Sequence, residues 1–141
     1  MCGFVALARK PSKISIPSEI LESMNNTLNH RGPDGEGYFY SQDNDLAFGH
    51  KRLSIIDLDN GHQPLSHPTN GLTIVFNGEI YNHKEIKKEL EDLGHDFNSH
   101  CDTEVLLAAW SQWKKNCIDK LNGMFAFVVW DENKKSLTAV R

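Results

Sequence analysis

The sequence has few cysteines and no long apolar run, and these absences narrow the class of protein. Cys2, Cys101 and Cys117 are the only cysteines among 141 residues, and so small and odd a number argues against a disulfide framework. No stretch approaches the ~20 apolar residues that a membrane-spanning helix needs. The first residues lack the basic and apolar regions of a signal peptide. We therefore expect a soluble, cytoplasmic protein with no membrane partner.

Positive charge is neither abundant nor clustered. The chain carries 15 Lys and Arg residues against 19 Asp and Glu residues, a formal net charge of −4. Because nucleic acids and anionic membranes are bound by concentrated basic surfaces, neither is predicted as a partner. The hydrophobic fraction of 39% and the charged fraction of 24% are ordinary for a globular protein. The length suits about one domain with its own core.

Strand and helix patterns alternate irregularly along the chain. Short apolar or alternating runs predict strands at residues 2–8, 37–41, 46–53, 54–57 and 72–76, and two more around a polar turn within 123–141. Helical periodicity predicts helices at residues 18–32, 82–94 and 102–115, and residues 59–70 form a polar loop. Since the order is not a regular strand–helix–strand repeat, the fold class is α+β rather than a doubly wound sheet.

The predicted helices carry end signals and apolar faces. Ser18 can cap the first helix, and Asn82 with Glu85 resembles a capping box at the second, which Gly94 ends. The expected buried positions are Ile20, Leu21, Met24 and Leu28 in the first helix, Ile86, Leu90 and Leu93 in the second, and Val105, Leu106, Ala109 and Trp113 in the third. The segment at residues 137–141 lies in an apparent strand without a cap or a polar tail, which suggests that more chain follows.

Cys2 directly follows the initiator methionine. If Met1 is removed, Cys2 carries both a thiol and a free α-amine, and an α-amine with a pKa of about 7.7–8.0 is a better matched base than a lysine amine. An N-terminal nucleophile activated by its own amine is a known catalytic arrangement. A cysteine at this position alone is more often a small apolar residue that enters a strand. Cys117, in contrast, is interpreted as a buried packing residue.

The Asn77-Gly78 pair follows the predicted strand at 72–76. Asn-Gly after an alternating strand is typical of a hairpin turn, but the next segment is helical, so the hairpin has no second strand. The alternative is that the Asn77 side-chain amide and the Gly78 backbone N–H form a donor pair for a developing oxyanion.

Two charged residues have both structural and binding interpretations. Arg52 ends a predicted strand and could be a surface residue or could hold a carboxylate through two parallel hydrogen bonds. Asp102 could cap the helix at 102–115 or could receive a ligand ammonium. His95, His100 and Cys101 do not match the spacing of a zinc site, so no metal site is predicted.

Six motifs together resemble one family. They are MCGF, RGPDG, GHKRLSIID, GHQPL, FNGEIYN and DTEVLL, in this order and spanning nearly the entire chain. The chain thereby resembles the glutaminase domain of glutamine-hydrolysing asparagine synthetases, which are class II glutamine amidotransferases. The resemblance implies an N-terminal nucleophile hydrolase fold, a four-layer αββα sandwich, for residues 1–141. It also implies that this domain is incomplete at its C-terminal end and that the synthetase domain is absent.

The resemblance also implies residue roles. Cys2 resembles the nucleophile, Asn77 and Gly78 the oxyanion hole, and Arg52 the group that binds the α-carboxylate of L-glutamine. Glu79 and Asp102 resemble the site for its α-ammonium. The backbone of Leu53 and Ile55 resembles a stretch that lines the same pocket.

The implied reaction is the hydrolysis of L-glutamine to glutamate and ammonia through a γ-glutamyl thioester on Cys2. In the full-length protein, a C-terminal synthetase domain would use that ammonia to make asparagine from aspartate. The glutaminase domain itself needs no cofactor, whereas ATP and Mg are expected for the synthetase domain. A homodimer is possible.

Three alternatives remain open. The same glutaminase domain could supply ammonia to a different acceptor, either a sugar or another activated carboxylate. The domain could bind glutamine without turnover, in which case Met1 would be retained or the Cys2 amine capped. Cys2 could also serve as a redox sensor.

Overall fold

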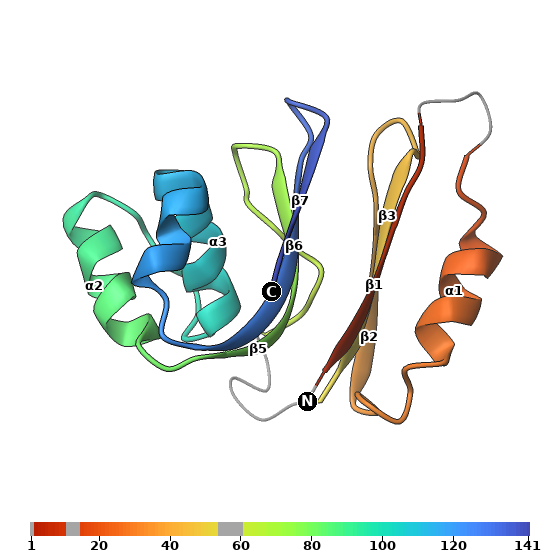
Figure 1. Ribbon diagram of the computed structural model, residues 1–141, viewed down its shortest axis with the longest axis horizontal. Helices are drawn as coiled ribbons and strands as arrows, with labels where there is room; N and C mark the ends of the chain where they lie inside the picture. The colour runs from red at the N-terminus through yellow and green to blue at the C-terminus, as the bar shows by residue number, and fades with distance from the viewer. Residues whose placement is uncertain (1, 11–14, 54–60) are drawn as a thin grey trace.

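Two antiparallel sheets pack face to face, and helices cover their outer sides (Figure 1). The computed structural model describes residues 2–10, 15–53 and 61–141. The first sheet has the strand order β1-β3-β2, from β1 (Gly3–Ala8), β2 (Gly35–Tyr40) and β3 (Leu46–Arg52). The second has the order β4-β5-β6-β7, from β4 (Leu65–Ser66), β5 (Leu72–Ile80), β6 (Gly123–Asp131) and β7 (Ser136–Val140).

The helices lie on opposite sides of this pair of sheets. Helix α1 (Ser18–Asn26) packs on the first sheet, and α2 (His83–Asp92) and α3 (Asp102–Trp113) cover the second (Figure 1). A 3₁₀ helix, η1 (Lys114–Lys120), follows α3. Within the described residues, no helix is long and apolar enough to cross a membrane. The α+β class is therefore confirmed, and the layers run helix, sheet, sheet, helix.

Three hydrophobic clusters fill the three interfaces between these four layers. Side chains alternate across a strand, so successive residues of one strand enter different clusters. In β5, Ile74 and Phe76 pack with α2 and α3, while Val75 packs with Phe48 of β3 between the sheets. The cluster under α1 is built on Leu21. Because β5 is buried on both faces, its position is fixed from two sides.

The predicted elements are largely confirmed, with corrections at their ends. The strand predicted at 72–76 continues through Asn77 and Gly78 to Ile80, so the hairpin interpretation is wrong. The first helix ends at Asn26 rather than near residue 32, and the predicted loop at 59–70 contains β4. The strand predicted at 54–57 lies outside the described residues.

The predicted helix caps are partly wrong. Ser18 is the first residue of α1, and Pro17 precedes it without a side-chain cap. Asn82 occupies the N-cap position of α2, but its side chain bonds the backbone of Lys120 and Asn122 instead. Gly94 does end α2, since it adopts φ +90° and donates its N–H to the Glu91 carbonyl.

Candidate active site

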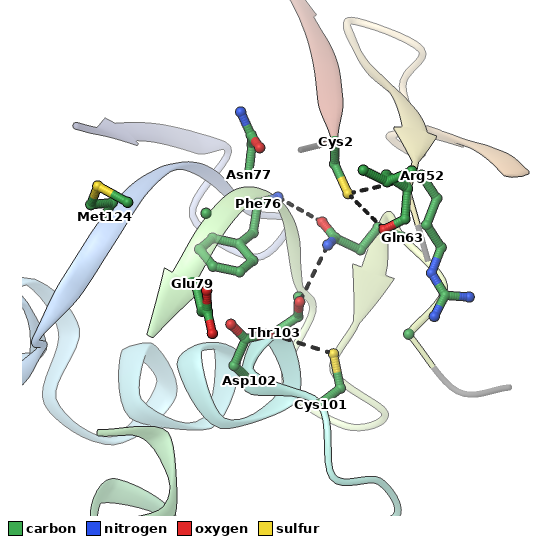
Figure 2. Close-up of a pocket in the computed structure, with 13 residues that line it drawn as sticks. Cys2, Arg52, Gln63, Phe76, Asn77, Glu79, Cys101, Asp102, Thr103 and Met124 are labelled. Carbon is green, nitrogen blue, oxygen red and sulfur yellow. Dashed lines mark hydrogen bonds between the residues drawn. The ribbon is translucent and has the colours of Figure 1, made fainter. Parts of the chain in front are cut away.

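A cavity of about 250 Å³ opens where β1 begins and where β3 and β5 end (Figure 2). Both sheets and the first turn of α3 contribute to its wall. The lining residues that the sequence predicted are Cys2, Arg52, Leu53, Asn77, Gly78, Glu79 and Asp102. Ile55 is the one predicted site residue that lies outside the described residues. Side chains that are up to 100 residues apart in the chain thus meet in one cavity.

Cys2 is held at the end of β3 by the backbone of Leu53. The Leu53 N–H donates to Cys2 Sγ at 3.4 Å, and the thiol donates to the Leu53 carbonyl oxygen at 3.7 Å. Cys2 is half-buried and lines the cavity. The position of Met1, on which the availability of the α-amine depends, lies outside the described residues.

Asn77 and Gly78 lie side by side in β5. Asn77 follows the side-chain alternation of Val75 and therefore faces the first sheet, the side from which Cys2 approaches. Among the described residues, the buried Asn77 Oδ1 has no hydrogen-bond partner. Buried polar atoms are normally paired, so this amide oxygen is an exception among the described residues.

The position of Gly78 requires glycine for two reasons. Its φ of +152° lies in a region that residues with a side chain rarely adopt. A Cβ at this position would also come within 2.2 Å of the Met124 carbonyl oxygen on the neighbouring strand β6. The missing side chain therefore lets the Gly78 backbone lie close to β6, and Gly78 also lines the cavity.

Arg52 of the first sheet lines the cavity, and a buried histidine lies beside it. His50 is 1% exposed and lines a smaller cavity of about 70 Å³ together with Arg52 and Gln63. Burial lowers the pKa of His50 to about 4, the Phe76 carbonyl opposes that shift, and the Arg52 charge adds to it. Neither ring nitrogen has a partner of good hydrogen-bond geometry within the described residues. His50 is therefore neutral at neutral pH, and Arg52 supplies the positive charge of this pair.

Two carboxylates enter from the second sheet and α3. Asp102 is buried, and its Oδ2 accepts the Ile80 N–H at 3.2 Å, so it holds the end of β5 rather than capping α3. Burial raises the pKa of Asp102, and the hydrogen bond from Ile80 opposes this shift. Glu79, the other predicted anion, is exposed at the cavity wall. Together with Arg52 they form a site with positive and negative groups on different walls.

Several lining residues were missed by the sequence analysis. They are Gly61, Gln63, Phe76, Cys101, Thr103 and Met124. Gln63 stands in the GHQPL motif, which carried the family resemblance but no residue role, and Thr103 adjoins the predicted Asp102. The motif position was the only signal for Gln63, since its contacts depend on long-range strand pairing.

The other two cysteines differ from Cys2. Burial raises the pKa of Cys101, whose thiol donates to Asp102 Oδ1 at 3.8 Å. Burial raises the pKa of Cys117 to about 11, and Cys117 packs in the core beside α3, as predicted. Among the described residues, no group of three or more His, Cys, Asp and Glu side chains is placed to hold a metal ion.

The sequence model of one family, described as a glutamine amidotransferase domain, matches residues 1–141. The chain belongs to this glutamine amidotransferase family. Two relatives of the amidotransferase domain are asparagine synthetases (glutamine-hydrolyzing) 1 and 3 of Bacillus subtilis strain 168, which are 46% and 39% identical over 143 residues. A third, the amidase chry2 of Gibberella zeae, is 36% identical over 151 residues. All three alignments cover the whole of this chain.

The amidotransferase domain spans only 22 to 23% of the length of these relatives. Two solved structures share its fold. One is a glutamine phosphoribosylpyrophosphate amidotransferase from B. subtilis complexed with ADP and GMP, with a TM-score of 0.72 and 20% identity over 94% of this chain and 35% of that one. The other is described as the allosteric regulatory enzyme of purine biosynthesis, with a TM-score of 0.73 and 22% identity over 94% of this chain and 36% of that one.

Proposed function

We propose that the domain hydrolyses L-glutamine to glutamate and ammonia through a γ-glutamyl thioester on Cys2. The observation that carries this proposal is that a candidate nucleophile, a donor pair, an arginine and two acidic residues from separate elements line one cavity. Glutamine has a carboxylate and an ammonium at one end and a neutral amide at the other. The cavity offers a group of matching chemistry for each of these three parts.

In the first half of the reaction, the Cys2 α-amine takes the thiol proton and Sγ attacks the side-chain carbonyl carbon of glutamine. The oxyanion that forms accepts hydrogen bonds from the Asn77 amide and the Gly78 N–H. The protonated amine then gives its proton to the leaving nitrogen, the carbon–nitrogen bond breaks, and ammonia leaves. The product is a thioester between Sγ and the γ-glutamyl group.

In the second half, water attacks the thioester and the same amine takes a proton from it. The carbon–sulfur bond breaks, the proton returns to sulfur, and glutamate leaves. Arg52 binds the α-carboxylate of the substrate through its guanidinium, while Asp102 and Glu79 bind the α-ammonium. These contacts hold the amide carbon over Sγ, which supplies the orientation that an attack by sulfur needs.

The context of the whole protein extends this proposal. The bacterial relatives are named glutamine-hydrolyzing asparagine synthetases. We propose that the full-length protein is likewise a cytoplasmic enzyme, in which a second domain uses the ammonia, with ATP and Mg, to convert aspartate to asparagine. In that protein the N-terminal nucleophile hydrolase domain would continue beyond residue 141, and a homodimer remains a proposal. The match to the amidase chry2 keeps a second candidate open, in which the same glutaminase chemistry serves a different acceptor.

Replacement of Cys2 tests the proposed reaction. In the full-length protein, we expect Cys2→Ala to abolish ammonia release while glutamine binding remains measurable, because Arg52 and Asp102 are retained. Cys117→Ala is the matched control, since it removes a thiol outside the cavity and should leave turnover unchanged. Ammonia release by Cys2→Ala at the wild-type rate would contradict the thioester. A working enzyme that retains Met1 would contradict the role of the α-amine.

A further inference from the structure

Gln63 joins three elements around the candidate active site. The register of β4 and β5 pairs Leu65 with Ile74, so Gln63, two residues earlier, stands opposite Phe76, two residues later. No backbone pair is formed there. Instead, the Gln63 side-chain Oε1 accepts the Phe76 N–H at 2.6 Å (Figure 2). The side-chain amide of Gln63 thus takes the place of a strand carbonyl just before β4 begins.

The other end of the same amide reaches α3. Gln63 Nε2 donates to Thr103 Oγ1 at 3.2 Å, and Thr103 is 2% exposed. Both functions of one buried amide are therefore used, one on the strand and one on the helix. A hydrogen bond between buried groups is costly to break, because the abandoned partner stays desolvated.

The backbone of Gln63 also rests on the first sheet. A Cβ at Gly37 of β2 would come within 2.1 Å of the Gln63 carbonyl oxygen, so the glycine permits this close approach. Gln63 consequently contacts β2 of the first sheet, β5 of the second and the first turn of α3.

Hydrogen bonds connect β5 to α3 at two points, one on each side of residues 77–79. Thr103 is linked through Gln63 to Phe76, and Asp102 accepts the N–H of Ile80. Between these two anchors on β5 lie the residues 77–79, which include the proposed oxyanion donors. The spacing of the anchors fixes that segment relative to the helix that carries Asp102.

We infer that Gln63 is a positioning residue, which sets β5 at the oxyanion donors and α3 at the ammonium site through its two hydrogen bonds. This inference rests on the proposed glutaminase reaction. Each of the two Gln63 side-chain hydrogen bonds, called here the Phe76 arm and the Thr103 arm, is expected to affect a different kinetic constant. The Phe76 arm controls the donors that act in the transition state, so its loss lowers kcat, whereas the Thr103 arm controls substrate binding, so its loss raises KM.

Three variants of the full-length protein separate these arms. Thr103→Val keeps the shape of the side chain and removes the hydroxyl, and we expect KM to rise about fivefold with kcat nearly unchanged, the scale of one lost hydrogen bond. Thr103→Ser restores the hydroxyl and should restore KM. Gln63→Met removes both arms at similar length, and we expect the same rise in KM with a fall in kcat of about tenfold or more.

The double variant Gln63→Met with Thr103→Val supplies a sharper readout. Since both substitutions remove the same hydrogen bond, KM of the double variant should equal that of Gln63→Met alone. Independent, multiplying effects would overturn the inference, as would a folded Gln63→Met whose kcat stays within twofold of wild type. If Gln63→Met does not fold, equal KM values for Thr103→Val and Thr103→Ser overturn it.

The Cys2→Ala variant in the same assay separates a failure of the proposed thioester reaction from a failure of the proposed role of Gln63. Turnover by Cys2→Ala contradicts the thioester reaction itself. An inactive Cys2→Ala together with a fully active Gln63→Met contradicts only the positioning role.

Discussion

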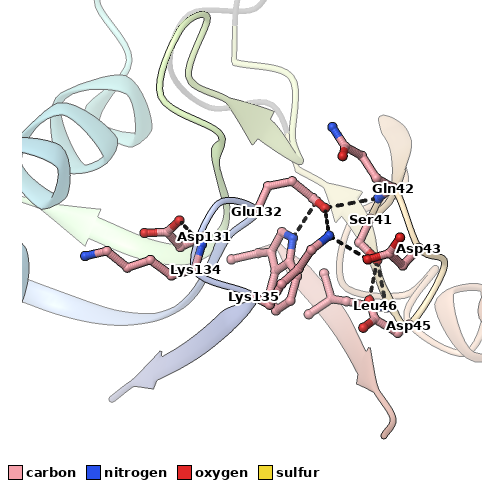
Figure 3. Close-up of polar contacts among 10 residues, drawn as sticks. Ser41, Gln42, Asp43, Asp45, Leu46, Asp131, Glu132, Lys134 and Lys135 are labelled. Carbon is pink, nitrogen blue, oxygen red and sulfur yellow. Dashed lines mark hydrogen bonds and ion pairs between the residues drawn. The ribbon is translucent and has the colours of Figure 1, made fainter. Parts of the chain in front are cut away.

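The two ends of the interface between the sheets are built from opposite kinds of polar contact. At the end away from the cavity, the β2–β3 and β6–β7 turns are tied by Lys135, which forms ion pairs with Asp43 and Glu132 (Figure 3). Glu132 also accepts the Gln42 N–H and the Trp130 indole N–H. The cavity end instead contains His50 and Asn77, whose buried atoms lack partners among the described residues.

Folding favours the charged form of the ionisable group at the far end and disfavours the charged forms of those at the cavity end. Hydrogen bonds from Lys135 to Asp43 and Glu132 raise the pKa of Lys135, so folding favours its charged form. Burial raises the pKa of Asp102 and lowers that of His50, so folding disfavours both of their charged forms. The far end therefore favours the folded state, whereas the cavity end keeps desolvated polar groups at a cost to stability. Such a division is expected where a site must bind a charged ligand.

The largest effect expected from this comparison is a fall in kcat for the Asn77→Ala variant. Removing one oxyanion donor typically costs ~10²–10³ in kcat. Because the Asn77 side-chain Oδ1 has no partner among the described residues, we expect no comparable loss of thermal stability. Steady-state ammonia release and thermal melting check both parts, with exposed Asn98→Ala as the control. Turnover within a fewfold of wild type would show that Asn77 is not an oxyanion donor.

The next effect is on substrate binding by Asp102→Asn. Loss of a charge-assisted hydrogen bond to the substrate ammonium should raise KM about tenfold or more. Because burial raises the folded-state pKa of Asp102, its ionised form destabilises the folded protein above that pKa, and the neutral amide removes this cost. The Tm at neutral pH should therefore stay level or rise.

The pH dependence of KM sharpens the test of Asp102. In the wild type, KM should begin to rise on acidification at a higher pH than an ordinary aspartate would give, since the protonated carboxyl cannot pair with the ammonium. Asp92→Asn, the same change at the exposed end of α2, is the control for net charge. A KM for Asp102→Asn that matches this control would remove Asp102 from the ammonium site.

The smallest effect is expected at the far end. Lys135→Met removes both ion pairs of an exposed side chain, and exposed pairs contribute little to stability. We expect a small fall in Tm and no change in kcat or KM. Lys134→Met, which removes the same charge from the adjacent residue, is the control. A marked change in kcat for Lys135→Met alone would show that the two ends are coupled, contrary to the comparison.

Local patterns predicted most of the fold, because they depend on neighbouring residues. The strand in β5 follows from its apolar run, and the end of α2 follows from Gly94, where His95 also donates its N–H to the Leu90 carbonyl. The apolar faces were predicted less well, since Ile20 and Met24 in α1 and Leu93 after α2 are 51%, 40% and 52% exposed. Asn25 is buried in α1 instead and donates to the His50 carbonyl, a contact that a stripe of apolar residues does not reveal.

In the candidate site, too, the residue types were predictable from the sequence whereas the contacts between them were not. Residue types and motif order predicted seven of the residues that line the cavity, from Cys2 to Asp102. The links that hold them together were not predictable, because Gln63 meets Phe76 through a strand register and Thr103 through helix packing. Both depend on contacts between segments far apart in the chain, which a single sequence does not specify.

Alkylation by a glutamine-mimicking electrophile tests the central claim most directly. The active full-length protein would be incubated with the electrophile and analysed by intact mass and peptide mapping. We predict one adduct, on the sulfur of Cys2, in a chain that has lost Met1 and carries a free terminal amine, with ammonia release lost in proportion. An adduct on Cys101 or Cys117, or an active chain that retains Met1, would contradict the account.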